Sequence, residues 1–456
     1  MAEPQSRLKQ GMGGLLLFAF ILGDVLGAGV YALSGRLAGG AGGMTWAPII
    51  VALLMALLTA GSYAELVTKY PKAGGAAVFA KRAYKSPVIA FLVGYCMLSA
   101  GIVSVGALAI AFAGDYLSAI MPVPVPIAAP IFLAILALIN MRGIKESVRT
   151  NLVMTIIETT GLVLVLVVVA IAMGDGMGDT SRLTQTPDDV STASGILGMA
   201  LLAFYSFVGF ETSANVAEEV RDVTRVYPRA LFGALLVAGF GYVLVAMASS
   251  IMLPPEELAE STGPLLDVVS ATGVSFPSWL FSTIALVAIA NTALMTSIMS
   301  SRLVYGMADE GLLPSVFTAV LPTRRTPWVA IIVTAALSAV LALAGELELL
   351  AEAVVLFLLF VFISTNLAVL VLKKDRVKHS HFTIPSPIPV LALGSCVVLL
   401  TQQTAEVWLL AAGLLIIGVV LYFVAQKVDT KGPHENREVT TDEARMQTDG
   451  TSGNRD

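Results

Sequence analysis

The sequence predicts an all-α integral membrane protein that crosses the bilayer twelve times. Of its 456 residues, 57% are hydrophobic and only 13% are charged, whereas roughly a quarter of the residues in a soluble domain are charged. The hydrophobic residues also gather into runs of about 20, the length that a helix needs to cross a bilayer. These two features exclude a soluble enzyme and a nucleic-acid-binding protein.

The apolar runs define the predicted spans, of which the fourth and the eleventh are short and flanked by proline. Residues 70–86 are basic and amphipathic, which indicates a re-entrant or surface helix. Residues 1–12 precede the first span, and residues 429–456 form a polar tail that we predict to be disordered. The spans cover approximately 13–36, 44–69, 87–114, 125–141, 150–173, 193–218, 229–252, 278–308, 327–345, 349–372, 387–403 and 406–426.

The charges of the loops predict the orientation of the chain. Basic residues gather after the second, fourth, sixth, eighth and tenth spans, and the alternate loops are acidic. Of the 27 Lys and Arg residues, only Arg36 and Arg182 fall on the acidic side. Because cytoplasmic loops carry an excess of Lys and Arg, we predict a multi-pass protein of the cytoplasmic (plasma) membrane with both termini in the cytoplasm.

Two spans contain glycines where a membrane helix is least able to expose its backbone, at 23–31 and at 204–211. A broken helix at membrane depth must line protein or a water-filled cavity, because lipid cannot satisfy the freed backbone groups. The first and sixth spans cross in opposite directions, and paired breaks in two inverted halves are typical of a transporter's binding site. The alternative is that these glycines only allow close helix packing.

The breaks offer both hydrogen-bond donors and hydrogen-bond acceptors to a substrate. The amides of Ala28, Gly29 and Val30 can point at a substrate carboxylate once the helix opens at Gly27. Carbonyls near residues 204, 205 and 208 can accept hydrogen bonds from a substrate ammonium. Aromatic side chains of the same segment are candidates for a lid, with core packing as the alternative. These lid residues are Tyr205 and Phe207.

Four segments resemble the motifs of the amino acid–polyamine–organocation (APC) superfamily of permeases, in the same order along the chain. They are Gly23–Tyr31, Tyr70–Gly75, Phe204–Glu219 and Ser300–Pro314, and the resemblance extends from about residue 11 to residue 426. It implies a LeuT-type fold and secondary transport of amino acids or related amines. The predicted domains are then one inverted repeat at 13–173, a second at 193–372 and two extra helices at 387–426.

The resemblance also suggests which residues hold the substrate, and it adds the carbonyl of Val25 to the groups named above. Glu218, at the end of the sixth span, is a candidate gate residue, with a simple ion-pair anchor as the alternative. The predicted substrate-binding residues are Val25, Gly27, Ala28, Gly29, Val30, Phe204, Tyr205, Ser206 and Val208.

Two acids depart from the motifs of this superfamily. Asp24 stands where many members carry a small residue, and Glu158 stands in the fifth span where many carry a lysine. A carboxylate at the bilayer centre costs about 2.5–3.5 kcal/mol on insertion scales, so it is a functional candidate by default. Either acid can exchange a proton, bind a cation or serve structure alone, and Asp24 can also meet a basic group of the substrate. The predicted companions of Glu158 are the eighth-span hydroxyls of Thr292, Thr296 and Ser297.

We therefore predict a secondary active transporter of amino acids that works by alternating access and is coupled to protons rather than sodium. The alternatives are an exchanger without ion coupling, a sodium symporter and, less favoured, a sensor that binds without transport. No cofactor is expected besides the coupling ion, H⁺ or Na⁺. No catalytic constellation is visible, so an enzyme is not expected. The expected partners are a small-molecule substrate and membrane lipid, without nucleic acid; the sequence leaves the substrate and any protein partner open.

Overall fold

The computed structural model describes residues 12–71, 75–142, 147–186, 191–309, 312–322, 324 and 326–429, and these residues form helices joined by short loops. Ten helical segments in this part are long and apolar enough to cross a membrane, and two shorter apolar helices accompany them. The short ones, α15 and α17, cover the predicted ninth and eleventh spans, whereas α8, which covers the fourth, reaches full length. The all-helical membrane architecture is thus confirmed.

The helices of the first half begin with a broken pair and end with an exposed 3₁₀ turn. They are α1 (Gly14–Leu26), α2 (Ala28–Leu33), α3 (Arg36–Ala41), α4 (Trp46–Lys69), α5 (Gly75–Tyr84), α6 (Pro87–Ala113), α7 (Asp115–Ser118), α8 (Val125–Arg142), α9 (Ser147–Gly174) and η1 (Thr180–Thr184).

The second half begins with another broken segment. Its helices are α10 (Thr192–Tyr205), η2 (Phe210–Glu219), α11 (Val223–Met252), α12 (Pro255–Glu260), α13 (Pro264–Ala271), α14 (Ser278–Asp309), η3 (Ser315–Thr318), α15 (Trp328–Ala344), α16 (Leu347–Leu372), α17 (Pro387–Leu400) and α18 (Ala405–Asp429).

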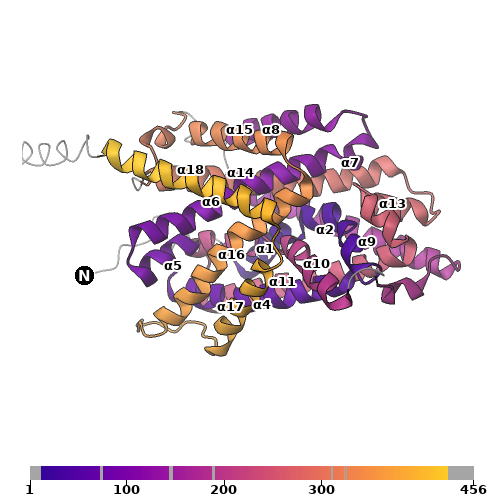
Figure 1. Cartoon of the computed structure of the whole chain (residues 1–456), viewed down its shortest axis with the longest axis horizontal. Helices are drawn as coiled ribbons and strands as arrows, with labels where there is room; N and C mark the ends of the chain where they lie inside the picture. Colours follow the sequence, from indigo (N-terminus) through magenta and orange to yellow (C-terminus); the bar gives the residue numbers. More distant parts are fainter. Residues whose placement is uncertain are drawn as a thin grey trace, which may run out of the picture.

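The two broken segments lie at the centre of the molecule. Figure 1 shows α1, α2 and α10 between one group formed by α6, α8, α14 and α15 and another formed by α4, α11 and α17. Residue contacts agree, because α1 packs on α9, α11 and α14, and α10 packs on α4 and α16. The residues around the two breaks are therefore largely surrounded by protein, as non-helical backbone at membrane depth requires.

The outer surface is unusually apolar, as expected of helices that face lipid. Long aliphatic side chains stay largely exposed on successive turns of the peripheral helices, where a soluble protein would carry polar groups. Examples on α8, α9 and α18 are Ile131, Ile135, Leu138, Val163, Val167, Ile171, Leu409 and Ile416.

Both predicted helix breaks are present. The first falls at Gly27, whose backbone (φ −43°, ψ −142°) is not helical and separates α1 from α2. The second follows Tyr205, where α10 ends in a turn that leads to Gly209 and then to η2. Gly209 has φ +123°, a conformation that side-chain-bearing residues rarely adopt.

The segment predicted to be a re-entrant or surface helix contains α5, with exposed Lys81 and Arg82 and buried Phe79. The predicted N-terminal segment before residue 12 and the predicted tail after residue 429 lie outside the described residues.

Residues 373–386, between α16 and α17, form a strap across the end of α4. The buried carboxylate of Glu65 on α4 pairs with Lys373 at 3.1 Å and accepts a 2.8 Å hydrogen bond from the Ile384 amide. Tyr70 donates to Asp375 at 2.6 Å, and Arg82 of α5 approaches the same carboxylate at 3.4 Å. The strap thereby joins α4, α5 and the end of α16 at one end of the molecule.

Candidate functional site

The two helix breaks face each other across contacts that leave no room for side chains. A Cβ on Gly29 would lie 2.6 Å from the Cα of Ser206, and one on Gly209 would lie 2.9 Å from the carbonyl oxygen of Asp24. A Cβ on Gly27 would lie 2.9 Å from that of Thr292 on α14. The glycines therefore let α1, α2, the 206–209 turn and α14 meet at one point.

A cavity of about 630 Å³ begins at these breaks. Both interrupted segments contribute to its wall, together with one face of α6, one face of α14 and the middle of α16. Residues at the break end of the wall include Asp24, Val25, Gly29, Ala100, Ser104, Tyr205, Ser206, Val208, Gly209, Glu211, Thr212, Thr292, Met295, Thr296, Val354 and Leu358. The volume is of the size that small-molecule sites have.

The two ends of the cavity differ. At one end the Tyr205 hydroxyl meets the Ser104 hydroxyl of α6 at 3.1 Å, and this contact joins α10 to α6 across the cavity. At the other end the wall includes Lys81, which is exposed, and Arg302, which is half-buried. The cavity therefore reaches the surface at its basic end.

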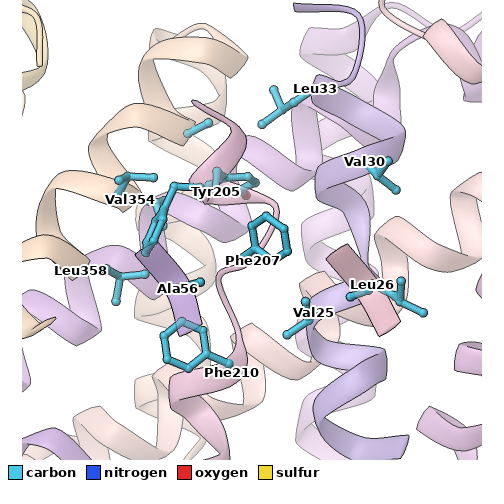
Figure 2. Close-up of a cluster of buried hydrophobic side chains, with 14 of the residues drawn as sticks. Val25, Leu26, Val30, Leu33, Ala56, Tyr205, Phe207, Phe210, Val354 and Leu358 are labelled. Carbon is cyan, nitrogen blue, oxygen red and sulfur yellow. The ribbon is translucent and has the colours of Figure 1, made fainter. Parts of the chain in front are cut away.

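The predicted aromatic lid residues lie on opposite sides of the turn. Figure 2 shows Tyr205 on the side of Val354 and Leu358, whereas Phe207 lies on the side of Val25. Phe207 is fully buried and packs edge-on against Tyr242 with ring centroids 5.5 Å apart. Only Tyr205 is part of the cavity wall, so of this pair it has the position that a lid requires.

Several backbone groups predicted to be free at the breaks already have partners. The carbonyl of Val25 accepts a 2.5 Å hydrogen bond from the Tyr242 hydroxyl. The carbonyls of Phe204 and Tyr205 accept turn hydrogen bonds from the amides of Phe207 and Val208, at 3.0 and 3.1 Å. The amides of residues 28–30 form the first turn of α2, where amides have no partner within the helix.

Asp24 lies at the contact between the breaks and is one of the acids in the cavity wall. One of its oxygens, Oδ2, accepts a hydrogen bond from Thr212 of η2. Thr212 also contacts the carbonyl of Gly209 at 2.7 Å, and Glu211 accepts a 2.9 Å hydrogen bond from the Gly209 amide. Two carboxylates thus lie close to Gly209.

Glu158 is sealed inside the protein. It has no exposed surface and does not line the cavity. Its Oε1 accepts a 3.0 Å hydrogen bond from Asn291 of α14, whose Nδ2 also lies 3.0 Å from Asn151 Oδ1, whereas Oε2 is buried with no partner among the described residues. Asp24 is near enough to interact electrostatically with Glu158.

The hydroxyls predicted to accompany Glu158 lie elsewhere on α14. Thr292 and Thr296 face the cavity, and Ser297 accepts a long hydrogen bond (3.4 Å) from Asn140 of α8. The side chain of Glu218, the other predicted gate residue, lies outside the described residues.

The sequence did not predict four residues that bond the groups described above: Ser104, Thr212, Tyr242 and Asn291. Their partners are, in the same order, Tyr205, Asp24, the Val25 carbonyl and Glu158. Asn291 and Ser104 are polar residues within apolar spans, and that is the signal by which they could have been found. Tyr242 and Thr212 carry no such distinctive signal.

Comparison with known proteins identifies the family. The family described as amino acid permease matches residues 12–438. The branched-chain amino acid permease BcaP of Bacillus subtilis is 26% identical over 94% of this chain and 95% of its own length. The chloroplastic cationic amino acid transporter 9 of Arabidopsis thaliana is 30% identical over 69% of this chain and 58% of its own length. The low-affinity putrescine importer PlaP of Escherichia coli is 27% identical over 73% of this chain and 75% of its own length.

The match covers both helix breaks, the cavity and the spans on either side. The chain therefore belongs to the amino acid permease family of the APC superfamily and is a multi-pass membrane protein.

Proposed function

We propose that the protein is a secondary transporter that carries an amino acid or a close amine analogue across the cytoplasmic membrane by alternating access. The observation that carries this proposal is the cavity that starts between two facing helix breaks and reaches the surface at its basic end. Such breaks at membrane depth are the usual site of substrate and coupling ions in secondary transporters. The family supports a substrate of this class.

The loop charges support an orientation with both termini in the cytoplasm. The exposed Lys81 then lies on the cytoplasmic side, and the cavity corresponds to an inward-facing state. In this state the Tyr205–Ser104 contact closes the path toward the outside. Opening to the outside requires this contact to break while the basic end closes.

The proposed layout is two inverted repeats, α1–α9 and α10–α16, followed by α17 and α18. A bundle of the first, second, sixth and seventh spans would rock against the third, fourth, eighth and ninth. The strap ties the end of α16 to α4, which is the second span. We therefore expect this end of α16 to move together with the bundle of the first, second, sixth and seventh spans.

Within the site, the amides of Ala28, Gly29 and Val30 receive the substrate carboxylate. The ammonium lies toward the 205–208 turn, where Ser206 and Val208 form the wall. The carbonyl of Val25 retains one lone pair for it besides the one that Tyr242 uses.

The two acids that can serve in coupling, Asp24 and Glu158, have different surroundings. Glu158 is sealed, and one of its oxygens has no partner. An ionised carboxylate in that position would lack compensation, whereas a neutral acid is far less costly to bury. We therefore assign the coupled proton to Glu158, with Asp24 as the acid nearer to the cavity. Thr292 and Thr296 border the same region from the cavity side.

Sodium symport and uncoupled exchange remain the competing mechanisms, and one uptake experiment separates the three. Purified protein in proteoliposomes is given radiolabelled amino acids and amines, with a pH gradient, with a sodium gradient, or with preloaded substrate and no gradient. A pH gradient alone should drive accumulation. Uptake that needs sodium, or that occurs only with preloading, would refute proton coupling, and binding without uptake under every condition would support a sensor.

A further inference from the structure

The acids beside Gly209 define a negatively charged part of the cavity. Asp24 and Glu211 both line the cavity, and both lie close to Gly209. A Cβ on Gly209 would lie 3.1 Å from Asp24 Cγ, and the Gly209 amide donates to Glu211 Oε2 at 2.9 Å. Asp24 comes from the first break and Glu211 from the second. The close approach of the breaks therefore brings the two carboxylates together.

Each acid has one carboxylate oxygen that no other described residue bonds. Asp24 Oδ1 and Glu211 Oε1 accept no hydrogen bond from another described residue. Neither belongs to the sealed oxygens without a partner, in contrast to Glu158 Oε2. Asp24 Oδ1 therefore keeps some exposed surface, the Glu211 carboxylate also bonds its own backbone amide, and both residues belong to the cavity wall.

No protein cation neutralises this pair within the described ranges, where neither acid takes part in an ion pair. The two bases of the same cavity lie near its other end: Arg302 is ten residues beyond Thr292 on α14, about 15 Å along the helix. Buried carboxylates without a counter-charge are costly, and a cationic ligand removes that cost.

A second feature of the wall points to a ligand as well. The hydroxyl of Ser206 lines the cavity beside the acids, is 92% buried and has no partner among the described residues. The cavity wall also includes the apolar residues Ala100, Met295 and Val354. Unbranched, flexible Met side chains adapt to an alkyl chain of variable length.

We propose that Asp24 and Glu211 recognise a primary ammonium at the end of an alkyl chain, which makes the substrate a cationic amino acid or a diamine. This assignment rests on the proposed transport function and narrows its substrate class. In the bound state the ammonium lies between Asp24 Oδ1 and Glu211 Oε1, the alkyl chain lies along Met295 and Val354, and the Ser206 hydroxyl bonds the remaining polar end.

The test is a binding titration of the purified full-length protein with lysine, putrescine and leucine, by calorimetry at neutral pH. Lysine or putrescine should bind about tenfold or more tightly than leucine, because only they carry a side-chain or second ammonium. Asp24→Asn should weaken their binding about tenfold or more and leave leucine unchanged within about threefold. Asp267→Asn, which removes an acid outside the cavity wall, is the matched control and should change nothing.

Binding of lysine alone or of putrescine alone supports the assignment and shows whether the ammonium belongs to a cationic amino acid or to a diamine. Leucine binding as tight as both, or full lysine and putrescine affinity in Asp24→Asn, overturns it while transport still stands. If Asp24→Asn does not fold, Glu211→Gln provides the same comparison. If no amino acid or amine binds and none enters proteoliposomes, the proposed function itself fails.

Discussion

Replacement of Glu158 by glutamine should separate substrate binding from the proposed proton coupling. Glutamine has nearly the same shape, and its carbonyl can accept the 3.0 Å hydrogen bond from Asn291 that Oε1 accepts now. It cannot carry a proton. Because Glu158 does not line the cavity, the substrate should still bind.

The size of the effect follows from the stoichiometry. In the proposed mechanism one sealed carboxyl carries one proton per cycle, and one pH unit is worth about 1.4 kcal/mol per proton. A gradient of one pH unit, alkaline inside, should therefore let the wild-type protein accumulate its substrate up to about tenfold without a membrane potential. Glu158→Gln should reach an inside-to-outside ratio of about one under the same gradient.

The assay is steady-state uptake of radiolabelled substrate into proteoliposomes whose membrane potential is clamped at zero. Exchange against preloaded substrate shows whether each variant still binds and moves its substrate. Glu352→Gln on α16 is the matched control, since it makes the same chemical change at an acid outside the cavity wall, and it should accumulate normally. If Glu158→Gln accumulates substrate as well as the wild type does, Glu158 does not carry the coupled proton.

Four further predictions test the contacts around the site and at the strap. Gly29→Ala should lower stability by about 1–3 kcal/mol in thermal melts and weaken substrate binding, because its Cβ would lie 2.6 Å from the Cα of Ser206; a fully stable, active variant would contradict this packing. Ser104→Ala and Tyr205→Phe should each favour the outward-facing state, and their double variant should show a coupling of about 1 kcal/mol in a conformation-sensitive labelling assay, whereas additive effects would disprove the gate. Glu65→Gln should destabilise the protein by about 2 kcal/mol, less than for a fully buried pair because Lys373 is 24% exposed, and an unchanged melting temperature would show that the strap is not held by this pair. The hydrogen bond from Tyr70, with help from Arg82, holds the pKa of Asp375 below its usual value. The stability that the Asp375 carboxylate contributes is therefore fully present above its unfolded pKa of 3.8 and is lost as the pH falls through its lower folded pKa. Asp375→Asn should abolish that part of the acid-induced loss of stability, as measured by melting temperature against pH.

Local chemistry made the breaks predictable from the sequence. Glycine at 27 and at 209 interrupts a run that is otherwise long enough to span, and lipid cannot satisfy the backbone so exposed. The same reasoning selected Asp24 and Glu158, because an acid within an apolar run is conspicuous. Both residues lie at or near the meeting point of the breaks.

The partners of these residues could not be predicted in the same way. Thr212 lies 188 positions from Asp24, and Asn291 lies 133 positions from Glu158. Thr212 is ordinary in its local context, and although Asn291 stands out as a polar residue in an apolar span, only the packing of distant helices selects it as the partner of Glu158. The expected hydroxyl companions of Glu158 illustrate this: Thr292 follows Asn291 directly but faces the cavity, since neighbouring positions on a helix point in different directions.

The shape of the second break and the position of Asp24 depend on the same contact, between Gly209 and Asp24. Gly209 combines a backbone conformation of φ +123° with a contact that would place any Cβ within 3.1 Å of Asp24. A side chain there would strain the turn and would also push Asp24 away from Thr212, the residue that orients it. Since the acid of one half is positioned by the turn of the other, any motion that separates the breaks must also release Asp24. In the proposed transport cycle the charge environment of Asp24 therefore changes, whereas that of Glu158, sealed between α9 and α14, changes only if those helices part.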